Sequence, residues 1–492
     1  MEKGWEMMKK REYRLLGAAI MAMLTFSAAL PAEASGVEIT KPGEAAETVQ
    51  KALQQPVKQV NFENMLLADK LPAASNPPEA ETLKIDLKGA VSTAIQNNRD
   101  IRISEYALTE AEASVSEAAA AKNPSLAYTF SAGRSKSGSG TSGRVASIQE
   151  SFGNGLNVTW PLWTGGRVEG LINAARYQRD AAEEAVYLSE AETKLSATSA
   201  YYQYLEAINL EDVSRESVEN LSSHLTNVQQ QYNAGIVAKL DVLSSNVSLA
   251  NAKQEYITAK NAKDVAEANL NNIMRLPMST KLIPIDTSFP EPEFTITMDQ
   301  ALAVADQNRW EILQAEYAYR AAKEQVKVAK SGYLPSVQVG GGYNWEDDDF
   351  PGFDHEGWSI TGGLSWSLWD GGATDAKIKS ANASMHSAEE TLQQVRESVA
   401  LEVKQDYLNI LSAKEKIRAT EAAVDEAEEA YKIATVRYKS GVGINLDVLD
   451  AQYNLNSART NYITALYDYN VGLATLEKAL GIPAVIREET QK

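Results

Sequence analysis

Two aspartates near the C-terminus, Asp447 and Asp450, stand three residues apart in a segment with helical periodicity. Side chains at i and i+3 share one face of a helix, so both carboxylates point to the same side. Such a pair concentrates negative charge, which attracts cations and repels anions. The three histidines are scattered, and none has the spacing of a metal site or a catalytic triad. These residues give no support for an enzyme, and no cofactor or metal is expected.

These aspartates belong to one of two matching segments. "YNAGIVAKLDVL" (232–243) matches "YKSGVGINLDVL" (438–449) at an offset of 206, and "EYAL" (105–108) matches "EYAY" (316–319) at an offset of 211. The chain is therefore a tandem repeat, with a first unit over about 86–277 and a second over about 297–483. Ser244 stands in the first unit where the second has Asp450.

Each unit has the same order of predicted elements. A helical stretch (88–121 or 299–331) precedes two strands, at 124–133 and 153–163 or at 335–345 and 358–369. Paired glycines then allow a sharp turn into a helical run of about 65 residues, over 167–231 or 373–437. The run stops at Gly235 or Gly441, and a second helix follows over about 241–275 or 447–481. At 1.5 Å per residue the long run measures ~100 Å, which predicts an extended bundle or tube.

The predicted strands alternate apolar and polar side chains, which is typical of strands with one apolar face. Tryptophans lie at or near the strand ends: Trp160, Trp163, Trp345, Trp358, Trp366 and Trp369. Short alternating segments ringed by aromatic residues are typical of outer-membrane β-barrels. A soluble sheet packed on the helices is the alternative, although the long helices run away from the strands. Because four strands cannot close a barrel, several copies are expected to contribute strands, and a trimer would supply twelve.

The N-terminus predicts export. Basic residues precede the apolar run Leu15–Leu30, and Ala32-Glu33-Ala34 forms a small-x-small cleavage site, so 1–34 is interpreted as a signal peptide. A membrane anchor is the alternative, but the run is shorter than the ~20 residues that it needs. The remaining predicted segments are a periplasmic linker or equatorial segment (35–85), a linker (278–296) and a tail (484–492).

The composition excludes two further classes. The net charge of −19 argues against a nucleic-acid partner, since phosphate binding needs a basic surface. The chain has no cysteine, which excludes disulfides, thiolate metal sites and a lipid-modified N-terminal cysteine.

The tandem unit, the signal peptide, the strand exit "WPLWTGGR" (160–167) and two "Y-x-x-G-x-x-x-x-x-D-V" turns make a specific combination. Through them the chain resembles the TolC-like outer-membrane efflux proteins (outer-membrane factors) over about 84–485. The resemblance implies a mainly α fold with a small β part. It implies a homotrimer with a 12-stranded transmembrane β-barrel in outer-membrane lipid, continuous with a 12-helix periplasmic α-barrel.

The resemblance also implies a location and partners. The protein would lie in the cell outer membrane with a long periplasmic extension, as the exit duct of a tripartite efflux pump. Its partners would be a periplasmic adaptor (membrane fusion) protein and an inner-membrane transporter, which would select the cargo. A type I protein secretion duct is one alternative, and a coiled-coil envelope spacer or adhesin is another.

The same resemblance assigns roles at the two helix-turn-helix tips. Asp447 and Asp450 would form rings at the periplasmic aperture, and Tyr438 would tie one tip to Asp241 of the other. A basic residue that strengthens this tie in the family is replaced by Gly443. Simpler interpretations are that Asp241 and Asp447 cap their helices and that Tyr438 packs in a coiled coil. The exposed turns would dock the adaptor through Ala234, Gly235, Ile236, Ser440, Gly441 and Val442.

Overall fold

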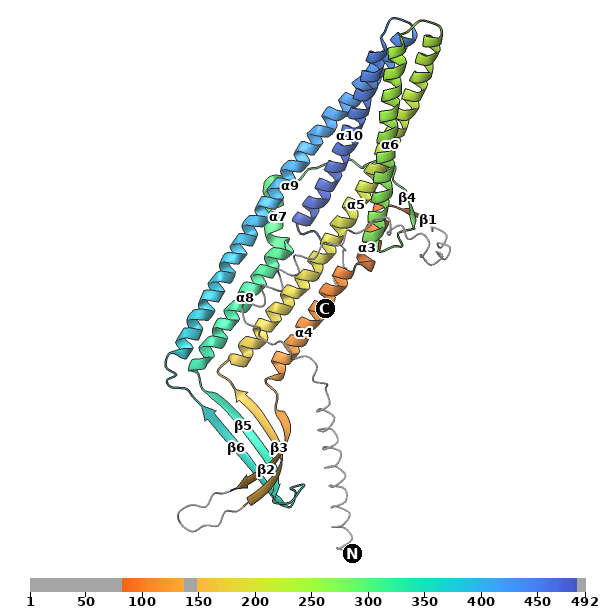
Figure 1. Ribbon diagram of the computed structural model, residues 1–492. Coiled ribbons are helices and arrows are strands. Elements are labelled where there is room, and N and C mark those ends of the chain that lie inside the picture. The colour runs from red at the N-terminus through yellow and green to blue at the C-terminus, as the bar shows by residue number, and fades with distance from the viewer. Residues whose placement is uncertain (1–81, 137–147, 485–492) are drawn as a thin grey trace, which may run out of the picture. The chain divides into compact units, whose positions relative to one another are not determined.

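The computed structural model describes residues 82–136 and 148–484 (Figure 1). The described residues fall into a sheet unit, within Pro124–Trp160 and Gln338–Gly363, and a helical unit, within Pro78–Asn123, Pro161–Val337 and Leu364–Lys492. The predicted signal peptide, most of the 35–85 linker and nearly all of the tail lie outside the described residues.

The sheet unit is built from the four predicted strands in the order β2-β3-β5-β6. β2 and β3 are antiparallel, and their pairing runs from Ser125↔Thr159 to Lys136↔Ile148. The strands are β2 (Ser125–Lys136), β3 (Ile148–Trp163), β5 (Ser336–Asp347) and β6 (His355–Ser365).

Two of the predicted strand boundaries differ from the structure by four residues or more. β3 begins at Ile148 instead of 153, because it follows its partner β2 out to Lys136. β6 ends at Ser365 instead of 369, and the indole of Trp366 donates a hydrogen bond to the Tyr333 carbonyl (3.0 Å) instead of continuing the strand.

One face of the sheet carries exposed apolar side chains, as the alternation predicts. On β2 and β3 these side chains are paired across the strands, as in Leu126↔Val158 and Tyr128↔Leu156, and all four are exposed. Trp358 and Ile360 of β6 are 73% and 76% exposed. The tryptophans predicted for an aromatic belt lie on or just beyond these strands.

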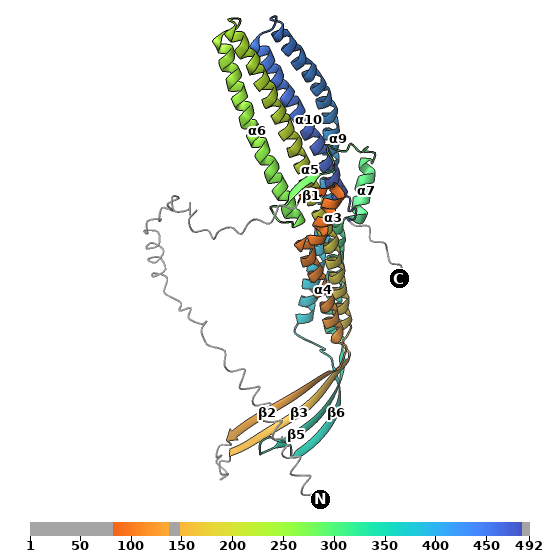
Figure 2. The same ribbon diagram turned by 90° about the vertical axis from the view of Figure 1, so that its right-hand side faces the viewer.

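The helical unit repeats its elements as the sequence does. Two hairpins, α5–α6 and α9–α10, lie side by side with their tips at the same end (Figures 1 and 2). Four shorter helices pack along the long ones: α3 and α4 on α5, α7 on α9, and α8 on both α5 and α9. The helices are α3 (Leu87–Asn97), α4 (Arg99–Ala120), α5 (Arg167–Asn233), α6 (Lys239–Met274), α7 (Met298–Asn308), α8 (Trp310–Lys330), α9 (Ala373–Lys439) and α10 (Asn445–Ala479).

No helix within the described ranges has the length and apolarity needed to cross a membrane. A short 3-10 turn, η2 (Ser331–Tyr333), follows α8. A two-stranded parallel sheet of β1 (Thr82–Ile85) and β4 (Lys281–Pro284) joins the two segments that were predicted as linkers.

The prediction of one continuous helix before each strand pair is wrong, because each stretch breaks at an extended residue. Asn98 has φ −63° and ψ 136°, and its side chain caps α4 by accepting from the Asp100 amide at 2.6 Å. Arg309 has φ −68° and ψ 121° between α7 and α8. A residue with extended ψ cannot continue the helix, so the chain changes direction there.

Arg309 is also the centre of a buried charge cluster. Its side chain is 1% exposed and forms ion pairs with Glu402 of α9 (2.8 Å) and Glu311 of α8 (2.6 Å). It also donates to the carbonyl of Lys478 in α10 at 2.8 Å. Burial and the charge of Glu402 raise the pKa of the neighbouring Asp406 to about 6. One arginine therefore joins α8, α9 and α10.

Around this cluster the main core contains both small and large side chains. Ala90 and Ala94 of α3, and Ala301 and Ala305 of α7, are fully or almost fully buried at equivalent places in the two repeats. Such spacing places small residues on one helix face and allows close approach to the long helices. Larger buried residues such as Tyr201, Leu205, Leu270, Met274, Val403 and Ile410 complete the core.

Candidate functional site at the hairpin tips

The first tip reverses the chain between α5 and α6 with a glycine in a left-handed conformation. Gly235 has φ 76°, a backbone angle that residues with a Cβ rarely adopt. Its amide bonds the Tyr232 carbonyl and the Ile236 amide bonds the Gln231 carbonyl, both at 2.9 Å. These are the two hydrogen bonds of a Schellman motif, which satisfies the last carbonyls of α5.

The second tip repeats this turn. Gly441 has φ 75°, and its amide bonds the Tyr438 carbonyl while the Val442 amide bonds the Arg437 carbonyl, both at 3.0 Å. Gly443 lies against the end of α9, where a Cβ would meet the Tyr438 amide nitrogen at 3.0 Å. The close approach gives a physical reason for glycine at the position where a basic residue was expected.

The residues predicted to dock a partner lie at these turns and are exposed. Ile236 and Val442 are 71% and 69% exposed at equivalent places. Ala234, Gly235, Ser440 and Gly441 are exposed beside them, and a Cβ added at either glycine would meet nothing within 4 Å. Each tip therefore presents an apolar side chain beside an uncovered stretch of backbone.

The aspartates lie in the first turns of the returning helices. Asp241 is in the first turn of α6 and Asp447 in the first turn of α10, where a negative charge suits the helix dipole. They do not cap these helices, because the N-cap residues are Ala238 and Ile444, which make no side-chain cap. Asp447 and Asp450 are both exposed.

Tyr438 is buried between the two hairpins. Only 4% exposed, it packs with Val228 of α5, Val242 of α6 and Val448 of α10. Burial, and to a lesser degree the charge of Asp241, raises its pKa. Its hydroxyl has no hydrogen-bond partner among the described residues, so the tie to Asp241 is not made within one chain. Tyr232, the equivalent residue of the first tip, is 38% exposed.

Asn445 connects the hairpins instead. This first residue of α10 is 5% exposed. Its Oδ1 lies 2.6 Å from His224 Nε2 of α5 and accepts from the Ser245 hydroxyl of α6 at 3.1 Å. Its Nδ2 donates to Ser244 Oγ at 3.0 Å and to the Asp241 carbonyl at 3.3 Å. One side chain thus uses its whole hydrogen-bonding capacity across the hairpins.

This set of contacts around Asn445, the Asn445 hub, was not predicted from the sequence, although one signal could have identified it. The repeat aligns Asn445 with Lys239, so the two tips differ at a position that is buried in only one of them. Burial lowers the pKa of His224, which keeps the ring neutral in the hub. Within residues 82–136 and 148–484, no group of three or more His, Asp or Glu side chains is placed to hold a metal ion.

The profile of the family described as "Outer membrane efflux protein" matches residues 90–274 and 301–482, which are the two repeats. The chain belongs to the outer membrane efflux protein family. The suspected TolC-like relationship is thereby confirmed, and so is the mainly helical fold with a small sheet. Family membership also places the protein in the outer membrane and supports its assignment as a non-enzyme.

The share of each relative's length that aligns with this chain differs between relatives. The outer membrane protein TolC of Escherichia coli (strain K12) is 26% identical over 317 residues, which are 61% of this chain and 63% of TolC. The outer membrane protein OprJ of Pseudomonas aeruginosa is 26% identical over 414 residues, 80% of this chain and 84% of OprJ. This outer membrane efflux protein thus spans less than two thirds of TolC.

A solved structure shows the same fold. A membrane protein from Pseudomonas aeruginosa superposes with a TM-score of 0.72 at 24% identity, covering 80% of this chain and 93% of that one.

Proposed function

We propose that three copies of this chain form an outer-membrane duct that is the exit of a tripartite efflux pump. The observation that carries the proposal is the sheet, which has two open edges, β2 and β6, and an exposed apolar face. An apolar face fits lipid, but open edges in lipid leave backbone groups unpaired, so strands of further copies must cover them. A trimer supplies twelve strands in a barrel, continuous with twelve periplasmic helices.

The long helices support the same assembly. Ile257 and Val265 of α6 are 67% and 59% exposed, and Leu401 and Leu408 of α9 are 57% and 52% exposed. Exposed apolar side chains on two outer helices of one protomer are suited to packing against neighbouring copies. In the closed tube each hairpin would then lie between two others.

At the periplasmic end, three copies would bring Asp447 and Asp450 together as rings of carboxylates. Both side chains are exposed on one face at the start of α10. Rings of this kind favour cations over anions in a narrow pore. The tip therefore combines an aperture with a charge filter. A tie from Tyr438 to Asp241 would hold it closed if the Tyr438 side chain, which is buried between the hairpins, turned outward.

This proposal predicts the outcome of a selectivity measurement. The protein reconstituted into planar lipid bilayers is expected to conduct, with cations more permeant than anions. Replacing both aspartates (D447N with D450N) is expected to lower the cation-to-anion permeability ratio severalfold, because the rings lose their charge. Reversal potentials under a salt gradient measure this ratio.

The control is Asp299→Asn, which removes an exposed first-turn carboxylate from α7, away from the tips. It is expected to leave the ratio unchanged. A wild-type protein without conductance would contradict the duct. Conductance with a ratio that D447N and D450N do not change would contradict the aperture alone.

The tips are proposed to dock a periplasmic adaptor that links the duct to an inner-membrane transporter. The chain has no cysteine, so Ser440→Cys provides a single attachment point for a photo-crosslinker in living cells. Ser116→Cys in α4, also exposed, is the matched control. We expect an adaptor to be trapped from position 440 and not from 116.

The identity of the trapped protein separates the alternatives. An adaptor of a drug or metal pump supports efflux, and one that serves a protein-exporting ATPase supports type I secretion. Trapping only envelope structural proteins, with efficient crosslinking, would favour the spacer or adhesin over the duct.

A further inference from the structure

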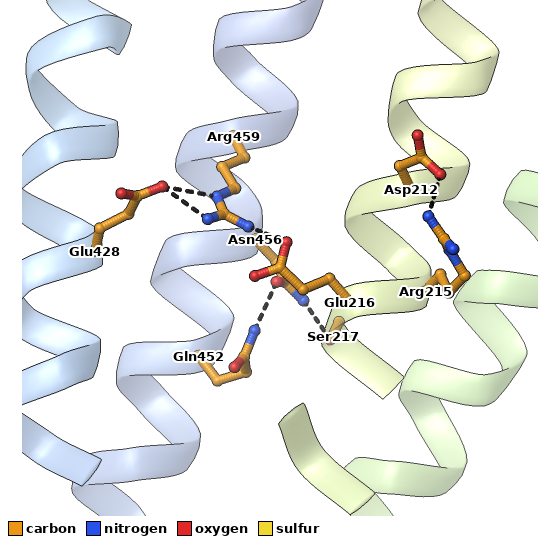
Figure 3. A network of polar contacts seen from close by, with 8 residues as sticks. All are labelled: Asp212, Arg215, Glu216, Ser217, Glu428, Gln452, Asn456 and Arg459. Carbon is orange, nitrogen blue, oxygen red and sulfur yellow. Dashed lines mark hydrogen bonds and ion pairs between the residues drawn. The ribbon is translucent and has the colours of Figure 1, made fainter. Parts of the chain in front are cut away.

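A second set of contacts joins the hairpins farther along α10, away from the tips, and it is charged (Figure 3). Arg459 of α10 bonds Glu216 of α5 through Nη1 at 2.7 Å. Its Nη2 and Nε bond a single oxygen of Glu428 in α9, at 2.7 and 3.2 Å. One guanidinium thus binds a carboxylate from each hairpin.

A neutral contact accompanies this ion pair. Asn456 of α10 donates to the hydroxyl of Ser217 in α5 at 2.6 Å, and Gln452 donates to Asn456 at 2.8 Å. Gln452 and Ser217 are 2% and 1% exposed. The contacts from α10 to α5 are therefore buried at Gln452 and Ser217 and open to solvent at Arg459, where the carboxylates of Glu216 and Glu428 are about half exposed.

The position of Arg459 along α10 separates this set from the tip. Fourteen residues divide it from Asn445, which corresponds to about 21 Å of helix. The Asn445 hub is buried and neutral, whereas the Arg459 cluster is partly exposed and ionic. Separating the hairpins therefore costs more free energy at the hub than at the Arg459 cluster, because breaking the hub leaves buried polar groups without partners.

The two partners of Arg459 belong to different hairpins, and the bond to Glu216 can therefore break at a small cost in free energy. Glu428 lies on α9, in the same hairpin as Arg459, whereas Glu216 lies on α5 in the other. If the hairpins separate, Arg459 keeps Glu428 and gives up only Glu216. No charge is left buried and unpaired, which is the event that makes the loss of a buried ion pair costly.

We propose that Arg459 limits how far the α9–α10 hairpin separates from α5 when the tip opens. This inference rests on the proposed duct, because separation of the hairpins is what would widen its periplasmic end. The Glu216 bond is the tie, and Glu428 holds the guanidinium in place on its own hairpin. Because the carboxylates are half exposed, salt weakens the tie by screening.

Single substitutions separate the tie from general packing. Glu216→Gln removes only the bond between hairpins, and Arg459→Gln removes both bonds. Glu428→Gln removes the bond within one hairpin. Arg215→Gln is the matched control, because Arg215 pairs with Asp212 three residues away in the same helix, beside the cluster in Figure 3.

The measurement is the open probability of purified protein in planar bilayers. We expect E216Q and R459Q to raise it about two- to five-fold, the factor by which exposed ion pairs shift an equilibrium. R215Q is expected to match the wild type, and E428Q to change it less than E216Q does. Exchanging the charges in a background without the Glu428 carboxylate (R459E with E216R and E428Q) is expected to restore the E428Q value, since the bond between the hairpins is kept with its charges reversed. High salt should move the wild type toward E216Q.

Hydrogen exchange of the same variants provides a readout independent of conductance. Peptides from 445–456 are expected to exchange faster in E216Q than in R215Q. Equal exchange in these two variants, or an effect of E428Q as large as that of E216Q, would overturn the inference. A wild type that does not conduct, with exchange still faster in E216Q, would refute the duct and leave the tie in place.

Discussion

Replacing Arg309 with methionine is expected to lower the free energy of unfolding by about 2–4 kcal/mol. The arginine is 1% exposed, and its removal leaves Glu402, Glu311 and the Lys478 carbonyl without their buried partner. The two carboxylates are about one third exposed, and the solvent that reaches them reduces the loss below that of a fully buried pair. Urea unfolding followed by circular dichroism, at fixed protein concentration, measures the change.

The control is Arg320→Met. Arg320 pairs with Glu316 one turn away on α8, and its side chain is 48% exposed. Its loss is expected to change stability by less than ~0.5 kcal/mol. Equal effects of the two substitutions would show that the buried cluster has no special importance.

The loss in R309M is also expected to depend on pH. Arg309 opposes the burial that raises the pKa of Asp406 to about 6, so this pKa should rise further in the variant. An acid with a folded pKa above its unfolded value destabilises the fold increasingly as pH rises through that interval. The difference between R309M and the wild type should therefore be larger at pH 7.5 than at pH 4.5.

Replacing Asn445 with alanine is expected to lower the free energy of local opening at the tips by about 2–3 kcal/mol, which is roughly 30- to 150-fold in the opening equilibrium. The substitution leaves the His224 ring, the Ser245 hydroxyl and the Asp241 carbonyl without their shared partner. Buried polar groups without partners lose their hydration with no compensation. Hydrogen exchange of peptides from 224–245 measures the opening.

Asn246→Ala is the matched control. Asn246 lies on α6 next to the hub, is exposed, and its side chain donates a hydrogen bond to the Val242 carbonyl of its own helix. Its exchange profile is expected to follow the wild type. Equal protection of the tip peptides against hydrogen exchange in N445A and N246A would show that the hub does not hold the hairpins together.

The sequence predicted what depends on local pattern. The strands, the two long helices and the glycine turns at Gly235 and Gly441 follow from patterns of neighbouring residues, and the repeat follows from comparing the chain with itself. The breaks at Asn98 and Arg309 were missed because apolar periodicity continues on both sides of them. Asn98 caps α4 with its own side chain, which is a local signal, whereas Arg309 makes no cap and its break is explained by its tertiary ion pairs.

The hub shows why the rest could not be predicted. His224 and Asn445 are 221 positions apart, and neither has a neighbour in sequence that suggests a pairing. Tyr438 illustrates the same limit, because its pattern matches Tyr232 while its burial does not. Contacts between hairpins depend on how one helix pair lies on the other, and single-helix patterns carry no such information.

The equal lengths of α5 and α9, 67 residues each, have a consequence for how this chain can change over time. The two turns must lie at the same height along the hairpins for the Asn445 hub to form, so α5 and α9 must keep the same length of about 100 Å. A deletion in one of these helices alone would put the hub out of register. The two long helices can therefore change in length only together, by equal insertions or deletions in both repeats.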